Sequence, residues 1–96
     1  MKFNYQQTMQ QAQNLEQLAS DLRSKTKPAI GGVKDNLNAA WTGDSGKAFI
    51  RFLGEVESDM DAKAKYLKNV SDYLKKTAKK IKQAEEAAKR SAAGIS

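Results

Sequence analysis

Four carboxylates near the middle of the chain come closest, by residue type and spacing, to a catalytic or metal site: Glu55, Glu57, Asp59 and Asp61. On a helix, only residues three or four positions apart share a face, so these acids divide into two pairs that point in different directions. A metal ion held by protein oxygens needs more ligands than two exposed carboxylates supply. The acidic cluster therefore favours a solvated helix surface over a metal site.

The 96-residue sequence contains no His and no Cys. Their absence excludes disulfides and the usual zinc sites, and it removes the commonest general bases and one of the commonest nucleophiles. No strand precedes a glycine-rich phosphate loop. We therefore expect a protein that is not an enzyme, with no cofactor, no metal and no small-molecule substrate.

Basic residues crowd the second half of the chain. From 63 to 90 there are ten basic and three acidic residues, while the whole chain carries a net charge of +6. The heptad pattern places eight of them on an outer face: Lys65, Lys68, Lys75, Lys76, Lys79, Lys82, Lys89 and Arg90. Non-specific nucleic-acid binding through this face is the alternative function, although a preponderance of Lys and a lack of aromatic residues there argue against it. Binding to an anionic membrane is a weaker alternative, because the opposite face is needed for packing.

Good helix formers and two clusters of Pro and Gly define the elements that position these residues. The sequence predicts a single helical-hairpin domain over 1–96, with helix 1 at about 5–40, a turn at 41–45, helix 2 at about 46–88 and a flexible tail at 89–96. Asp44 or Ser45 is the expected N-cap of helix 2. Pro28 is expected to kink helix 1, with a break at this point as the alternative.

Apolar residues follow a 3.5-residue repeat through helix 2, and a third apolar line widens the stripe beyond what one partner helix can cover. Two antiparallel helices have an interface but no interior, so the sequence predicts an all-α antiparallel hairpin that dimerises into a four-helix bundle. Lys63 is a polar break in this seam, which either snorkels or helps to set the register. The predicted core of hairpin and dimer consists of Leu15, Leu18, Leu22, Val33, Leu37, Phe49, Phe52, Leu53, Val56, Met60, Leu67, Val70, Leu74 and Ile81.

The first residues lack the apolar run of a secretory signal peptide, and no window approaches the roughly 20 apolar residues of a membrane-spanning helix. If the protein leaves the cell, we expect it to do so without a cleaved signal peptide.

A Trp-X-Gly turn at mid-chain, Trp41-Thr42-Gly43, is followed by Ala48 and Phe49 at the start of helix 2. With the chain length and the flanking heptads, this turn resembles the WXG-100 family, small proteins exported by type VII secretion systems in Gram-positive bacteria and mycobacteria. Gly43 suits a positive φ, and Trp41 suits the open end of a bundle. The resemblance implies an exported substrate, secretion helper or virulence-associated factor that is cytoplasmic before export. It also implies contact of Trp41 with the secretion ATPase.

The family commonly carries an export signal, a Tyr followed four residues later by Asp or Glu, and no tyrosine of this chain has an acid at that spacing. Tyr73, followed by Thr77, is a candidate for a degenerate signal, with a position at the edge of the core as the alternative. The dimer partner or the basic tail could serve instead. The resemblance implies pairing, and the complementary apolar faces favour a homodimer over a heterodimer with a related protein.

Overall fold

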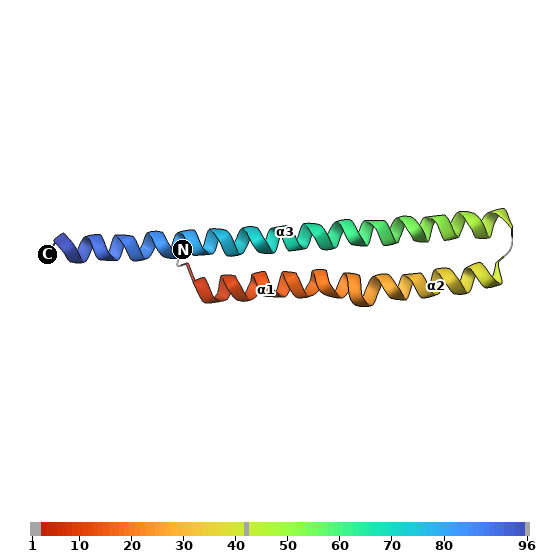
Figure 1. Ribbon diagram of the computed structural model, residues 1–96, viewed down its shortest axis with the longest axis horizontal. Coiled ribbons are helices and arrows are strands. Elements are labelled where there is room, and N and C mark those ends of the chain that lie inside the picture. Colours follow the sequence, from red (N-terminus) through yellow and green to blue (C-terminus); the bar gives the residue numbers. More distant parts are fainter. Residues whose placement is uncertain (1–2, 42, 96) are drawn as a thin grey trace.

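The structure, a computed structural model, describes residues 3–41 and 43–95 and forms a long antiparallel helical hairpin (Figure 1). One arm consists of α1 (Tyr5–Asp21), a π-helical segment η1 (Leu22–Thr26) and α2 (Lys27–Ala40). The other arm is the single helix α3 (Asp44–Ile95). The described residues contain no strand, so the predicted all-α hairpin is confirmed.

The first arm begins at a capped helix end. Asn4 has an extended backbone, and its side-chain oxygen accepts a hydrogen bond of 2.9 Å from the Gln7 amide. The Thr8 hydroxyl donates to the Asn4 carbonyl at 2.9 Å. Because the free amides of a first turn need acceptors, the bond from the Gln7 amide to the Asn4 side chain caps α1 at its start, Tyr5.

Pro28 neither breaks the first arm nor leaves a regular helix around it. The helix widens into η1 just before the proline, where the Lys27 amide bonds to the Leu22 carbonyl five residues earlier. Pro28 then lies in the first turn of α2, directly after the widened segment. The alternative of a break at Pro28 is wrong, because helical structure continues through 22–27, and η1 is the local distortion of the helix next to the proline.

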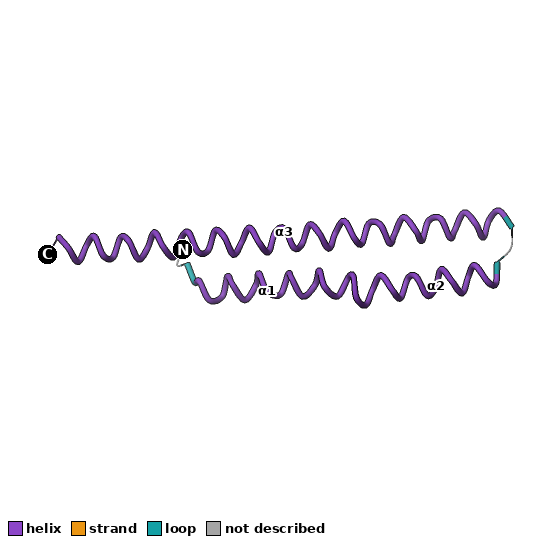
Figure 2. The backbone as a smooth tube through the Cα atoms, viewed as in Figure 1, coloured by secondary structure: helices purple, strands orange, loops and turns teal. Residues whose placement is uncertain are grey.

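The second arm is longer than the sequence predicts. Helix α3 starts at Asp44 and extends to Ile95, so the residues from 89 to 95 are helical where a tail is expected, and residue 96 lies outside the described part. Figures 1 and 2 show α3 continuing well beyond the start of α1. Near the start of α1, the Lys82 ammonium lies over the Tyr5 ring, 4.5 Å from its centroid. Every residue from 79 to 94 is exposed.

Within the part of the chain that the structure describes, none of the helices combines the length and apolarity that crossing a membrane requires.

Candidate functional site

The closed end of the hairpin is built around two changes of backbone direction. Helix α2 ends at Ala40, and the next residue, Trp41, has an extended backbone and donates its amide to the Leu37 carbonyl at 2.7 Å. Gly43 has a φ of +115°, a backbone conformation that residues with a Cβ rarely adopt. The Gly43 carbonyl then accepts the Lys47 amide at 3.1 Å, which makes Gly43, rather than the expected Asp44 or Ser45, the residue flanking α3. Thr42, between Trp41 and Gly43, lies outside the described residues.

Three aromatic side chains gather beside this turn, and we call Trp41, Phe49 and Phe52 the aromatic cluster. The Trp41 and Phe49 ring centroids are 5.6 Å apart, and those of Phe49 and Phe52 are 6.2 Å apart, both in tilted arrangements. The three residues remain 47%, 40% and 54% exposed. Rings in mutual contact are oriented by one another, so the hairpin presents a large apolar surface in a defined geometry.

Gly46 holds Trp41 against the first turn of α3. It is buried, and a Cβ added to it would lie 2.8 Å from the Trp41 Cβ. Non-bonded contacts of a Cβ are essentially never this short, so Trp41 can pack here because residue 46 is Gly. Gly46 was not among the residues predicted for the site, because glycine within a helical pattern is expected only to destabilise the helix.

The two arms meet along a line of small side chains, which we call the small-residue seam: Ala12, Ala19, Ala64, Ser71 and Ala78. On each arm these residues are spaced by seven, which places them on one face. The Ser71 hydroxyl donates to the Ala12 carbonyl at 2.7 Å inside the seam. Small side chains let the helices approach closely, so the larger apolar residues are directed to the flanks.

The predicted core residues consequently lie beside the seam. None of the fourteen is fully buried in the single chain. Half-buried are Leu15, Leu22, Leu37, Leu53, Val56, Met60, Leu67, Val70 and Leu74. Exposed are Leu18, Val33, Phe49, Phe52 and Ile81. The seven-residue spacing of Ala64, Ser71 and Ala78 could have predicted the seam from the sequence. It was missed because the core was assigned from large apolar residues alone.

Ion pairs join the arms near the turn, where η1 and α2 bury no residue. Lys34 contacts Glu57 at 2.7 Å, and Lys27 contacts Asp61 at 2.8 Å. The hydrogen bond to Glu57 raises the pKa of Lys34. Two of the four clustered carboxylates therefore hold the hairpin together.

Further from the turn, Glu16 bonds to both Lys75 and Lys68, the latter at 3.0 Å. The bond from Lys75, followed by the bond from Lys68, lowers the pKa of Glu16 from 4.5 to about 2. The bonds that Lys68 donates to Glu16 and Asp72 raise the pKa of Lys68. Glu16 therefore ties α1 to α3 through two lysines.

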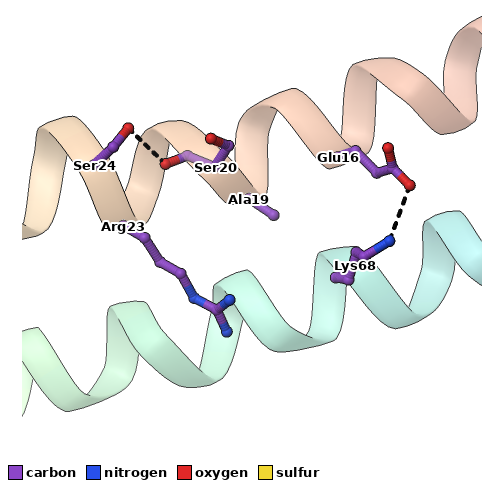
Figure 3. A pocket seen from close by; sticks show the side chains of 6 residues that line it. All are labelled: Glu16, Ala19, Ser20, Arg23, Ser24 and Lys68. Carbon is purple, nitrogen blue, oxygen red and sulfur yellow. Dashed lines mark hydrogen bonds and ion pairs between the residues drawn. The ribbon is translucent and has the colours of Figure 1, made fainter.

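A groove of about 520 Å³ opens beside these charges, between α1, η1 and α3. Figure 3 shows the Glu16 to Lys68 pair at one end of the groove, Arg23 extending toward α3 further along, and the Ser24 hydroxyl bonded to the Ser20 carbonyl on the first arm. Because Lys68 is paired with Glu16, these two charges of the groove join the arms of the hairpin.

These contacts correct the predicted outer basic face. Lys68 and Lys75 bind Glu16, and Lys82 covers Tyr5, so three of its eight residues contact α1. Lys63 neither packs in the seam nor pairs across the hairpin, because it bonds to Asp59 on its own helix at 2.7 Å, with both side chains exposed. Tyr73, the candidate export signal, is 68% exposed on α3.

The comparisons with known proteins agree with the turn geometry. The family model described as "WXG100: Proteins of 100 residues with WXG" matches residues 1–86. A search of curated proteins and a search of solved structures returned no match. The matched range covers the aromatic cluster, the turn and the small-residue seam. The chain therefore belongs to the WXG100 family of small helical proteins associated with type VII secretion.

Proposed function

We propose that this protein is exported by a type VII secretion system, as a substrate or secretion helper, and that it acts through protein–protein recognition. The observation that carries this proposal is the aromatic cluster, because Gly43 and Gly46 hold three half-exposed rings at the closed end of the hairpin. Aromatic side chains dominate the binding energy of protein interfaces. A surface oriented before binding loses less entropy when a partner arrives.

Trp41 is the proposed contact to the secretion ATPase. Its ring lies against Phe49 while 47% of the residue remains exposed, so it is both positioned and accessible. Substituting Trp41 removes the ring and leaves Gly43 and Gly46 in place, which separates recognition from folding of the turn.

A second copy of the chain is the proposed partner of the flank of the hairpin. Phe52, Tyr66 and Tyr73 are exposed and spaced by multiples of seven, so they form one stripe on α3. Leu18 is exposed on the other arm. Since isolated hairpins leave such residues in water, two hairpins packed through these flanks would form a four-helix bundle.

The order of charges along α3 favours an antiparallel pair of hairpins. Residues 44–61 carry five acids and two bases, whereas residues 63–90 carry three acids and ten bases. A parallel pair would set like-charged halves side by side, and an antiparallel pair sets each basic half beside an acidic one. A heterodimer with a related protein remains the alternative, and sedimentation equilibrium decides by returning twice 10.6 kDa for a homodimer.

Tyr73 is the proposed degenerate export signal, in competition with its place on the dimer stripe. A Tyr73→Ala protein that remains dimeric and is not exported would assign it to the signal. A protein that loses dimerisation would assign it to the interface.

Export is the direct test of the proposed function. The protein is tagged in its own organism, and culture medium is compared with cytoplasm in strains with and without the secretion ATPase. We expect ATPase-dependent appearance in the medium without cleavage of the N-terminus, and loss of export for Trp41→Ala with unchanged helicity. Retention of the parent protein in both strains would contradict the proposal.

A further inference from the structure

A second groove lies at the closed end of the hairpin, between the end of α2 and the start of α3. It has a volume of about 450 Å³, and its lining consists of Asn38, Asp44, Lys47, Ile50 and Arg51. Helical residues two positions apart point in nearly opposite directions, because a turn holds about 3.6 residues. Arg51 and Ile50 therefore face away from Phe49 and Phe52, and the groove lies on the side opposite to the aromatic cluster.

The cations of this groove differ from those of the hairpin interface. Lys47 and Arg51 are the only two bases of residues 44–61, and both line the groove. Lys27 and Lys34, on the facing arm, each bind a carboxylate of α3. Among the described residues, neither Lys47 nor Arg51 has an ion-pair partner, although Glu55 lies four residues after Arg51.

We infer that this groove docks an acidic segment of a partner protein in the export pathway. A guanidinium binds a carboxylate through two parallel hydrogen bonds, and an ammonium one turn away can hold a second carboxylate. Ile50 offers an apolar contact between them, and the Asn38 amide adds a donor. Asp44 repels acids at the other end, which directs the carboxylates toward Lys47 and Arg51.

The inference rests on the proposed function and adds the chemistry of the partner. Because the groove and the aromatic cluster lie on opposite sides of the closed end of the hairpin, a partner that surrounds this end can contact both. A second copy packed on the stripe of Phe52, Tyr66 and Tyr73 leaves the groove open, since Ile50, which lines the groove, lies two positions before Phe52 and therefore points in nearly the opposite direction.

The first test is direct binding to the full-length protein. The probe is a capped glutamate-rich peptide with one central leucine, titrated by calorimetry at fixed ionic strength. We expect Lys47→Gln/Arg51→Gln to weaken binding about tenfold or more, because charge-assisted hydrogen bonds are lost. The matched control, Lys76→Gln/Lys80→Gln, removes two exposed cations at the same spacing on the same helix and should leave affinity within about twofold.

An equal loss in both double variants would show attraction to net charge alone and would overturn the inference, as would a parent protein that does not bind. The single variant Arg51→Lys keeps the charge and removes the bidentate geometry, so it should show an intermediate loss. Circular dichroism confirms that each variant is folded before its affinity is compared.

The same variants in the export assay separate this inference from the proposed function. We expect the groove variant to be exported poorly and the control to be exported like the parent. If the parent is exported and the groove variant is exported equally well, the groove inference fails and the proposed function stands. If the parent is not exported but the peptide binds through Lys47 and Arg51, the proposed function fails and the groove stands as an acidic docking site.

Discussion

Ser71 of α3 donates its hydroxyl hydrogen to the backbone carbonyl of Ala12 of α1, at 2.7 Å, in a seam where both residues are fully buried. A helical carbonyl has a second lone pair, so Ala12 can accept this bond without giving up its helical partner. Contacts between alanines alone would allow α1 and α3 to pack in more than one register. The bond therefore assigns one residue of α3 to one residue of α1.

Replacing Ser71 tests how strongly the small-residue seam sets the fold. Ser71→Ala keeps the close approach and loses the hydrogen bond, so we expect the free energy of unfolding to fall by about 1 kcal/mol. Ser71→Leu must separate the helices, and we expect a loss of about 1–3 kcal/mol or more. Urea unfolding at one protein concentration measures both, with the exposed Ser58→Leu as control. A Ser71→Leu protein as stable as the control would contradict close packing at this position.

Gly46→Ala is expected to be destabilising although alanine is the better helix former. The new Cβ would meet the Trp41 Cβ at 2.8 Å, so Trp41 must move and its fluorescence, from the only Trp of the chain, should change. Gly54→Ala is the matched control, because nothing lies within 4 Å of a Cβ there. The control should stabilise the helix by about 0.5–1 kcal/mol. Equal stabilisation by both substitutions would show that Gly46 is not required for packing of Trp41.

The pH dependence of stability should report the Glu16 contacts. The pKa of Glu16 is lowered from 4.5 to about 2 by the bonds from Lys75 and Lys68. A carboxylate with a lowered pKa in the folded state stabilises the fold above its unfolded pKa, and this contribution is lost as the pH falls from about 4.5 toward 2. Glu16→Gln should therefore lose less stability than the parent over this range.

Thermal unfolding at successive pH values compares the two proteins, with Glu55→Gln as the control because no ion pair is described for Glu55. If Glu16→Gln and Glu55→Gln follow the same curve, the Glu16 contacts do not persist in solution.

Lys63→Leu should strengthen the proposed dimer. Lys63 interrupts the apolar flank, and its exposed pair with Asp59 contributes little to stability. Leucine at this position would be buried once in each copy, and we expect the dissociation constant to fall about tenfold. Sedimentation equilibrium measures it, with Lys65→Leu as the control because residue 65 points away from residue 63. Loss of all dimerisation by Lys63→Leu would instead assign Lys63 to setting the register.

The sequence determined the helical hairpin and its turn. Residues that favour helices repeat every 3.5 positions, and Gly43 marks the point where the chain reverses because it tolerates a positive φ. These are local properties, readable without knowing what each face meets. Family membership follows from the same residues, because the Trp-X-Gly motif and its position lie in the chain itself.

Which face of each helix meets the other depends on how the two arms pack. A heptad repeat shows which residues lie together on a helix but not whether the large or the small row is buried against the partner. Here close approach favoured Ala64, Ser71 and Ala78, and the larger residues were left on the flanks. The pairing of Glu16 with lysines of α3 and the contact of Gly46 with Trp41 also join residues of different helices. The periodicity of the sequence does not say how closely the two helices approach. Because they approach closely, the row of small residues lies at their contact.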